Sequence, residues 1–328
     1  MAPRCSRGLW RLAPAVLPLG VLTACPQLLD DEFYAGLDGR DASSGGESVL
    51  DAGALPSGPP GPGGGAKPPP GRDAGSAEDA GATPLSPVQV ALRAALAHRY
   101  RFDTSAPLVD SMGGPDAVSE GAAFSAGAAV LTGGGTTGPY IDLPNGLLSG
   151  LRNASFEIWV IWDVDDPTDT TSEWQRIFDL GRNPTSVEGQ QCVLNADATS
   201  LYLTPRTNGA SGKLQLKCET CGETQIVAPS LAVGVQTQLV GVVDDDGNLL
   251  SLYRDGEFVA SQPYPGSLAT ITDCTARTAP CDWNNWLGRS QHIEDPTFQG
   301  RILDFRIYSA ALAAELIRAS FSAGPDAD

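Results

Sequence analysis

The feature that constrains the fold most is a run near the C-terminus in which apolar side chains occupy every second position. Such period-two alternation, with β-branched and aromatic residues, predicts a strand that has one face in a core. Leu312, Leu316 and Ile317 then fall on one side of a helical turn, so we expect a short helix directly after the strand. A strand and short helix at this position are typical of a closing sandwich domain. The run is Arg301–Tyr308, with Leu303, Phe305 and Ile307 predicted to share the core face.

Further strand candidates precede this run and are separated by turn signals. The clearest is Ala154–Trp162, and Asp-Gly pairs at residues 246–247 and 255–256 predict hairpin turns between apolar runs. Many short strands with little helix predict an all-β sandwich or barrel. A short helix is predicted over Pro87–His98, directly before this domain. The other strand candidates are Tyr140–Leu143, Arg176–Leu180, Leu201–Leu203, Lys213–Cys218, Thr237–Val243, Leu249–Arg254 and Glu257–Ser261.

The charge balance excludes some partners. The chain has 39 Asp and Glu residues against 21 Lys and Arg residues, which gives a formal net charge of −18. A surface of this sign repels phosphate backbones and anionic lipid, so we expect no nucleic-acid partner. After the N-terminus no stretch approaches the roughly 20 apolar residues of a membrane-spanning helix. Any contact with a membrane is therefore expected through an anchor alone.

Residues 1–24 have the composition of a targeting segment, with three arginines before a short apolar stretch. The tetrapeptide LTAC at residues 22–25 then resembles the lipobox of bacterial lipoproteins. That resemblance implies that Cys25 becomes the lipidated first residue of the mature chain, in the bacterial cell envelope. Pro26 after the cysteine favours transfer to the outer membrane. An ordinary signal peptide cleaved nearby is the alternative.

Composition also divides the rest of the chain. Residues 25–86 are dominated by Gly, Pro, Ala, Ser and Asp, with few large apolar side chains. Such a segment cannot bury enough surface to offset its ordering entropy, so we expect a disordered linker that holds the domain away from the membrane. We expect a folded domain over 87–323, followed by a short tail over 324–328.

Motifs in the C-terminal half match a known family. They are a strand ending in an acid at 238–244, LYRDGEFV at 252–259, WLGRS at 286–290 and FQGRILDFRIY at 298–308. Together they resemble the laminin-G-like branch of the concanavalin-A-like lectin/glucanase superfamily, over roughly residues 95–321. The resemblance implies a jelly roll of two curved antiparallel sheets. The family's helix-capping serine is Ala313 here, a loss that costs that helix about 1 kcal/mol.

The superfamily also contains glucanases, whose catalytic acids lie together on one strand in the pattern Glu-x-Asp-x-(x)-Glu. No such triplet occurs here, and Glu157 stands alone on its predicted strand. Retaining hydrolysis needs two carboxylates about 5 Å apart. We therefore expect a non-catalytic module that binds carbohydrate or a surface protein. A glucanase with acids from distant loops, and a structural envelope or adhesion subunit that binds protein, are the alternatives.

Many laminin-G-like domains bind one calcium ion, so the resemblance implies a calcium site. Its ligands are expected to come from Asp304 and from the loop Asp110–Gly114. The acidic loops at 163–169 and 244–246 are interpreted as solvated turn acids, because the second lacks the alternate spacing of an EF-hand loop.

Two of the seven cysteines are lost to the signal peptide and the lipid anchor. An exported domain favours disulfides for the other five, with one left over. Cys274 and Cys281 flank a short loop and form the expected pair. A second bridge is expected between Cys192 and either Cys218 or Cys221. The Cys218–Cys221 spacing also suits redox or zinc chemistry, but neither a following helix nor a second pair is visible.

In proteins that bind sugars, aromatic rings stack on the faces of the sugar. Asn, Asp and Arg side chains form hydrogen bonds with its hydroxyl groups. We interpret Trp159 and Trp162 as core residues. The remaining candidates for ligand contacts are Trp283, Asn284, Asn285 and Trp286, together with Trp174 and Tyr264.

Overall fold

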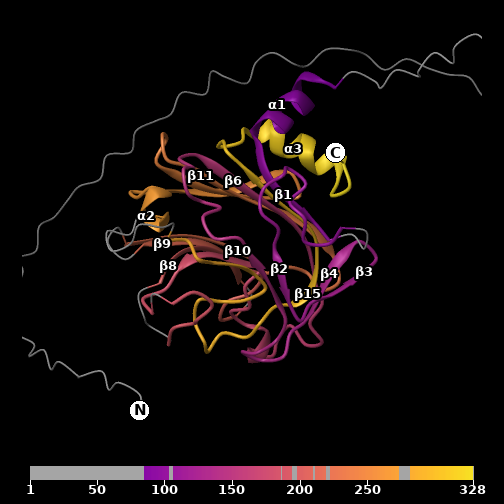
Figure 1. Cartoon of the computed structure of the whole chain (residues 1–328), viewed down its shortest axis with the longest axis vertical. Helices are drawn as coiled ribbons and strands as arrows, with labels where there is room; N and C mark the ends of the chain where they lie inside the picture. Colours follow the sequence, from indigo (N-terminus) through magenta and orange to yellow (C-terminus); the bar gives the residue numbers. More distant parts are fainter. Residues whose placement is uncertain are drawn as a thin grey trace, which may run out of the picture. The chain divides into compact units, whose positions relative to one another are not determined.

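The computed structural model describes residues 85–102, 106–185, 187–193, 198–209, 211–218, 222–272 and 281–327. Two antiparallel sheets lie face to face in this part of the chain (Figure 1), as the predicted all-β jelly-roll sandwich requires. The predicted signal peptide, Cys25 and nearly all of the predicted linker lie outside the described residues, so these stay predictions. No helix of the described residues is long and apolar enough to cross a membrane.

The larger sheet has eight strands and is built around the alternating run, which becomes β15 (Gln299–Tyr308). One edge of β15 pairs with β6 (Ala154–Trp162), and its other edge pairs first with β4 (Ala128–Thr132) and then with β1 (Leu96–Arg101). The outer strands are β11 (Gln236–Asp244), β12 (Leu249–Arg254) and β13 (Glu257–Pro263) beyond β6, and β3 (Ala123–Ser125) beyond β4.

One part of the predicted alternation is wrong. The register between β15 and β6 shifts between Ile302 and Asp304, which places a β-bulge at Leu303. A bulge adds one residue to one strand, so Ile302 joins Phe305 and Ile307 in the main core, whereas Leu303 is only half-buried. Residues after the bulge follow the prediction, and the side chains of Asp304, Arg306 and Tyr308 face away from the core.

The smaller sheet has seven strands in the order β10-β9-β8-β7-β14-β5-β2. Its predicted members have the expected positions to within a few residues, and β5 coincides with its prediction. Three strands, β10, β14 and the short β2, were not predicted as strands, because charged or polar side chains interrupt their apolar pattern. The bounds are β10 (Gly222–Pro229), β9 (Ser211–Cys218), β8 (Thr199–Thr204), β7 (Phe178–Arg182), β14 (Asn284–Leu287), β5 (Tyr140–Leu143) and β2 (Val118–Glu120).

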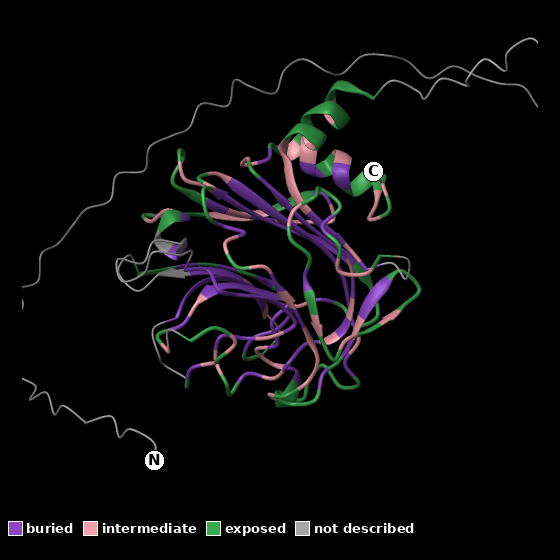
Figure 2. Ribbon diagram, viewed as in Figure 1, coloured by how far each residue is buried: buried purple, intermediate pink, exposed green. Residues whose placement is uncertain are grey.

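The main core fills the space between the two sheets (Figure 2). On β6, Phe156, Ile158, Val160 and Trp162 all point into it, as predicted. Burial of apolar surface on this scale is the dominant favourable contribution to folding. Asp255 and Gly256, with φ of 51° and 80°, form the tight turn between β12 and β13 that the sequence predicts.

Two helices cover the outer face of the larger sheet (Figure 1): α1 (Pro87–Ala95) and α3 (Ala314–Ala323). Ser86 caps α1 in a capping box, and α1 ends three residues before the predicted helix does, because β1 begins at Leu96. The N-cap of α3 is Ala313, which makes no side-chain hydrogen bond, as predicted. A short helix, α2 (Ala269–Thr272), and a 3₁₀ helix, η1 (Thr170–Ser172), lie in loops.

Candidate functional site

The outer face of the seven-stranded sheet carries a row of polar and aromatic side chains. Ile141 and Leu180 point into the core, so their strand neighbours Asp142 and Asp179 point outward. The ladders pair Trp286 of β14 with Asp142 of β5 on one side and with Asp179 of β7 on the other. Paired residues share a face and lie roughly 5 Å apart at Cβ. The indole ring therefore stands between two carboxylates.

Arg289 covers this row at the β5 end. Its guanidinium lies 4.4 Å from the centre of the Trp286 ring and 4.5 Å from the centre of the Tyr140 ring. The two rings meet edge to face with their centres 6.0 Å apart. Arg289 Nη2 also donates to Gln191 Oε1 at 3.2 Å. Tyr140, Asp142 and Arg289 are half-buried, whereas Trp286 is fully buried beneath them. We call these four residues the Tyr140–Arg289 cluster.

Two buried atoms of the Tyr140–Arg289 cluster have no hydrogen-bond partner among the described residues: Asp142 Oδ1 and Trp286 Nε1. Buried polar groups are nearly always paired, because leaving one unpaired costs about 1–3 kcal/mol. One of these atoms accepts hydrogen bonds and the other donates. A small shift that brings the two atoms together satisfies both requirements, and so does a hydroxyl group, which can donate and accept at once.

The electrostatics of Asp142 set it apart. Burial raises the pKa of this carboxyl to about 6, and the neighbouring carboxylates of Glu188 and Glu120 add to the rise. The Trp286 indole N–H, which points toward this carboxyl without reaching full hydrogen-bond geometry, and the charge of the Arg289 guanidinium both lower the same pKa. Asp142 therefore changes charge close to neutral pH, whereas an ordinary aspartate changes charge near pH 4.

Of the four residues of the WNNW motif, only Trp286 belongs to this cluster. Trp283, Asn284 and Asn285 are buried, and the structure does not bring them into the cluster, so their contact with a ligand stays a prediction. Asn284 Oδ1 accepts from Gly189 N at 2.9 Å, and its Nδ2 donates to Gln190 O and Gln291 Oε1, both at 3.1 Å. The asparagines thus hold loops in place.

Asn285 Nδ2 donates to Pro144 O at 3.0 Å and to Asp282 O at 2.9 Å. Tyr264, the other aromatic candidate, is also buried, in the main core. Trp286 is buried as well, because Arg289 and Tyr140 cover its ring, and its N–H edge points toward Asp142.

Trp174 lies near the other end of the row, beside β8 and β9. It is half-buried and has a φ of 61°, a strained conformation for an aromatic residue. Its indole donates to Asn208 Oδ1 at 2.8 Å, and Lys213 Nζ lies 4.9 Å from the ring centre. Arg176, fully buried, holds the Trp174 carbonyl at 2.6 Å. The structure therefore does not bring Trp174 together with Trp286, and Trp174 stays a separate candidate.

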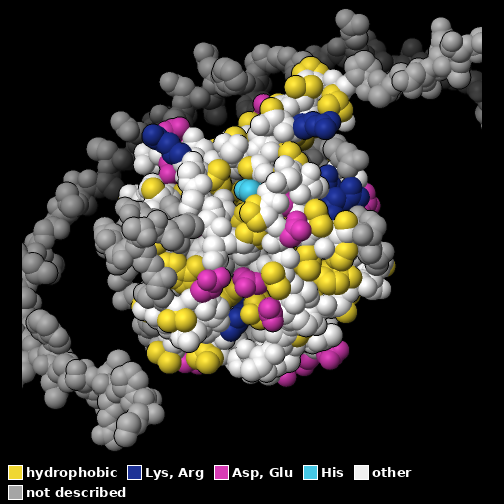
Figure 3. Space-filling view, in the orientation of Figure 1, with side chains coloured by type: hydrophobic (Ala, Val, Ile, Leu, Met, Phe, Trp, Pro, Cys, Tyr) yellow, Lys and Arg dark blue, Asp and Glu magenta, His cyan; other side chains and the backbone are white. Residues whose placement is uncertain are grey.

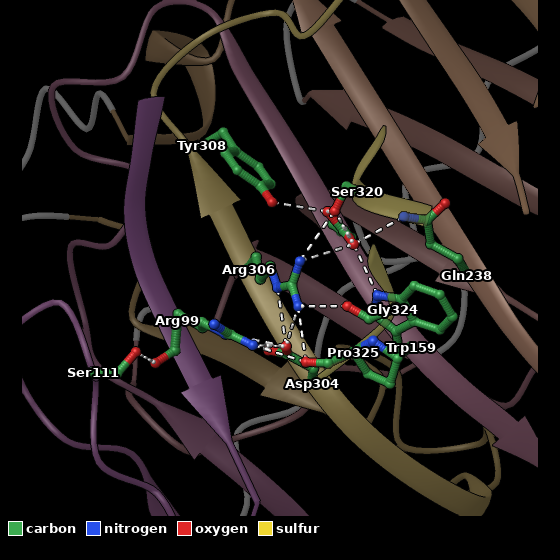
Figure 4. A network of polar contacts seen from close by, with 11 residues as sticks. Arg99, Ser111, Trp159, Gln238, Asp304, Arg306, Tyr308, Ser320, Gly324 and Pro325 are labelled. Atoms are coloured by element: carbon green, nitrogen blue, oxygen red, sulfur yellow. Dashed lines mark hydrogen bonds and ion pairs between the residues drawn. The ribbon is translucent and has the colours of Figure 1, made fainter. Parts of the chain in front are cut away.

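The predicted calcium ligands do not form a site. Asp304 accepts from Arg99 Nη2 at 2.8 Å and from Arg306 Nη2 at 2.7 Å (Figure 4). Asp110 instead accepts from the backbone N–H of Arg99 at 3.0 Å and lies 2.7 Å from His98 Nδ1. Two guanidinium groups already neutralise Asp304, so it does not fit Ca²⁺. In the described part of the chain no group of three His, Cys, Asp or Glu residues could hold a metal ion.

The network around Asp304 is a structural feature of the larger sheet. Figure 4 shows it between β15 and the C-terminal segment, where Arg306 reaches the carbonyl groups of Gly324 and Pro325. Glu157 completes it, accepting from Tyr308 Oη at 2.9 Å and from Trp159 Nε1 at 2.8 Å. None of its side-chain atoms is among the buried atoms that lack a partner. This network therefore fixes α3 to the sheet and leaves nothing for a ligand to satisfy.

A groove of about 1060 Å³ lies above this network, between α1, β1 and α3. Arg93 and Arg318 lie on its walls, and Figure 3 shows basic side chains beside the two helices. Arg99 and Arg306, which also line it, are paired with Asp304. Because these two charges are satisfied internally, the groove is a weaker candidate site than the Tyr140–Arg289 cluster.

The predicted cysteine bridges stay predictions. Cys192 is buried, and its Sγ lies 3.4 Å from Gln291 O and 3.5 Å from His292 Nδ1. Cys192 follows β7 and forms a β-bridge with His292 after β14, on the opposite side of β7 from β9. Cys281 is buried, and Cys274 lies outside the described residues, so their pairing stays a prediction.

Sequence reasoning missed Tyr140, Asp142 and Arg289 as site residues. Asp142 is the polar residue in the otherwise apolar strand β5, which was the available signal. Arg289 lies within the WLGRS motif used for the family resemblance. What the sequence does not show is the pairing of β14 with β5 and β7, which brings the cluster together.

Comparison with known proteins places the fold. The family model Laminin_G_3, described as concanavalin A-like lectin/glucanases superfamily, matches residues 134–318, and the chain belongs to this family. The predicted resemblance is thereby confirmed at the level of the superfamily. The comparison with curated protein sequences found no match.

Solved structures share the fold at low identity. A botulinum neurotoxin type C structure is 12% identical, with a TM-score of 0.51, over 71% of this chain and 52% of that chain. The binding domain of botulinum neurotoxin DC is 12% identical, with a TM-score of 0.50, over 70% and 52%. Domain 4 of AbnA, an extracellular arabinanase from Geobacillus stearothermophilus, is 20% identical, with a TM-score of 0.49, over 68% and 97%. This chain thus matches about half the length of each neurotoxin chain.

Proposed function

We propose that this chain is a non-catalytic carbohydrate-binding module whose glycan site is the Tyr140–Arg289 cluster. The observation that carries the proposal is the pair of buried, unpartnered atoms, Asp142 Oδ1 and Trp286 Nε1, beneath a half-buried aromatic ring and guanidinium. Glycan hydroxyl groups pair with both kinds of atom, and a half-buried tyrosine ring offers apolar contact to a sugar face.

Each residue of the cluster has a role in this proposal. Asp142 accepts from a sugar hydroxyl, and the Trp286 indole donates to the same or a neighbouring hydroxyl. Arg289, which lies against both rings, presents its remaining N–H donors. Because the cluster is built on β5 and β14, in the middle of a sheet, its side chains are already ordered before the ligand binds, which lowers the entropic cost of binding.

The proposal assigns no catalysis. Asp142 and Asp179 flank Trp286 on strands that are two positions apart, about 10 Å between backbones, and burial raises the pKa of Asp179 as well. These two carboxylates are the observation that favours a glycoside hydrolase as a second candidate. However, Asp179 is 1% exposed, accepts from Gln291 N at 2.9 Å and pairs with Arg176 at 3.4 Å. Release of reducing ends from a polysaccharide panel by the wild type, and not by Asp142→Asn, would establish the hydrolase.

We further propose that the module is anchored by a lipid on Cys25 and displayed from the outer membrane on the linker of residues 25–86. The lipobox-like tetrapeptide and the linker's composition support this arrangement. Two or three acyl chains give a stable anchor. Detergent partition of the expressed chain, compared with Cys25→Ser, tests it, because the variant should move to the aqueous phase.

The structural neighbours are compatible with a binding role. The neurotoxin type C structure is named for cell entry that depends on interaction with two ganglioside molecules, and the neurotoxin DC domain is in complex with rat synaptotagmin II. Those two proteins, which share the fold, are thus described with a glycan ligand and a protein ligand. A surface protein remains the alternative partner for this chain.

A glycan array probed with the chain from residue 26 onward tests the proposal, with calcium and with chelator. Binding to a defined sugar class should fall about tenfold in Tyr140→Ala, which removes one aromatic contact. The matched control is Phe258→Ala, an exposed aromatic on the other sheet, which should bind as the wild type does. Equal losses in the two variants, or no binding by the folded chain under either condition, would refute the site.

A further inference from the structure

The charges around the Tyr140–Arg289 cluster are predominantly negative. Glu120 of β2 pairs with Tyr140 in the ladder and so lies on the same face. Glu188, in the loop after β7, accepts from Asn145 Nδ2 at 2.8 Å. Both carboxylates act on Asp142, as the direction of their effect on its pKa shows. Three carboxylates therefore surround a single guanidinium.

That guanidinium makes no ion pair with Asp142 in the described part of the chain, although its charge lowers the pKa of that carboxyl. Arg289 lies against both aromatic rings and donates to Gln191. Asp142 Oδ1 remains without a partner, and so does the buried Trp286 Nε1 beside it. The Trp286 side chain has no exposed surface, and its N–H faces Asp142 without completing a hydrogen bond.

The ligand classes differ in how they meet these charges. A sialic or uronic acid would bring a fourth carboxylate to the cluster and be repelled. A neutral hydroxyl would satisfy the hydrogen bonds but leave the excess negative charge unchanged. A protonated amine supplies up to three N–H donors together with a positive charge, and a nearby opposite charge stabilises an ionised carboxylate. Adjacent sugar hydroxyls remain available to accept from the indole N–H.

We propose that the glycan bound at this cluster carries free amino groups, as in a polymer of 2-amino-2-deoxyhexose that is not N-acetylated. The proposal rests on the proposed function, since it names the sugar class of that same site. Ammonium groups approach Asp142 and Glu120 from the solvent side, where the Tyr140 ring provides an aromatic surface that also favours a cation.

Titration calorimetry on the chain from residue 26 onward tests this class. The probes are the β-1,4-linked tetramers of glucosamine, N-acetylglucosamine and glucose, together with a tetragalacturonate. At pH 7 the glucosamine tetramer should bind about tenfold more tightly than the two neutral tetramers, and the galacturonate most weakly. The preference should shrink as salt is raised, because the charges are partly exposed to solvent.

Variants separate the charge preference from binding as such. Glu120→Gln removes a charge beside the cluster and should reduce the preference severalfold while the glucose tetramer binds as before. The matched control is Glu223→Gln, an exposed acid on β10 at the far edge of the same sheet, which should leave the preference unchanged. The thermal midpoint of each variant shows that it is folded.

The outcomes are distinct. Preferred binding of the glucosamine tetramer that Glu120→Gln weakens and Glu223→Gln does not would support the inference. Equal or tighter binding of a neutral or anionic tetramer would overturn the amino-sugar class and leave the proposed glycan site standing. Binding of no tetramer by the folded chain would overturn the inference, and a silent glycan array as well would overturn the proposed function.

Discussion

Trp286 and Asp142 are direct partners in the β14–β5 ladder, and each carries a buried polar atom that nothing in the described part of the chain satisfies. In the Asp304 network of the larger sheet, by contrast, two arginines surround one buried carboxylate. The contrast between a satisfied network on one sheet and an unsatisfied pair on the other locates the candidate site. It also distinguishes changes that affect stability from those that affect binding.

Asp142→Asn should change how stability depends on pH. Burial raises the pKa of Asp142 in the folded chain to about 6, whereas the pKa of an aspartate in the unfolded chain is about 3.9. The folded state therefore binds this proton more tightly, and ionising Asp142 lowers stability as pH rises from about 4 to 6. Relative to the wild type, the variant should gain thermal stability at pH 7 and gain little at pH 4. An equal difference between the two proteins at both pH values would contradict this assignment.

Asp304→Asn should destabilise the fold without changing the proposed glycan site. The substitution leaves Arg99 and Arg306 buried without their shared carboxylate, which costs about 3 kcal/mol of unfolding free energy. Denaturant unfolding measures the loss. The control is Arg318→Gln, whose ion pair with Glu257 is exposed and should contribute less than about 0.5 kcal/mol. Comparable losses in both variants would mean that the network is not a structural anchor.

Gly288→Ala should weaken both stability and glycan binding. Gly288 has a φ of 90°, and an added Cβ would lie 2.5 Å from Leu131 Cδ1. The change therefore combines backbone strain with a clash, at a cost of about 1–3 kcal/mol. It also moves the chain just before Arg289. Gly150→Ala is the control, because Gly150 has a similar φ of 85° but open space around it. If the two variants behave alike, the clash at Gly288 plays no part.

Much of the fold could be predicted from the sequence, because alternation reports directly on which face of a strand is buried. β5, β6 and β12 begin and end where their patterns do. The alternation failed at Leu303, since a bulge inserts a residue without leaving a local signature. It also missed β14, where Asn284 and Asn285 are buried by hydrogen bonds to distant loops rather than by apolar packing.

The site was harder to predict, because its residues come from strands far apart in the chain. Trp286 was singled out from the sequence, but its neighbours Tyr140 and Asp142 lie more than a hundred residues earlier and meet it only through the sheet order. The asparagines before Trp286 carry amide groups of the kind that bind sugars, but in the structure these amides form hydrogen bonds to neighbouring loops. Residue type alone does not distinguish these two uses, whereas burial and hydrogen-bond partners do.

An NMR titration with the glycan that binds best on the array tests whether the glycan binds at the Tyr140–Arg289 cluster. The signal to follow is the indole N–H resonance of Trp286. The signal is assigned with Trp286→Phe, and Trp162 serves as the internal control, because its Nε1 already donates to Gln175 Oε1 at 3.0 Å in the core. The account predicts that the Trp286 signal shifts in proportion to bound ligand while the Trp162 signal stays in place. A Trp286 signal that is unchanged at saturation, with the Trp174 signal shifting instead, would contradict the account and move the glycan to the other end of the sheet.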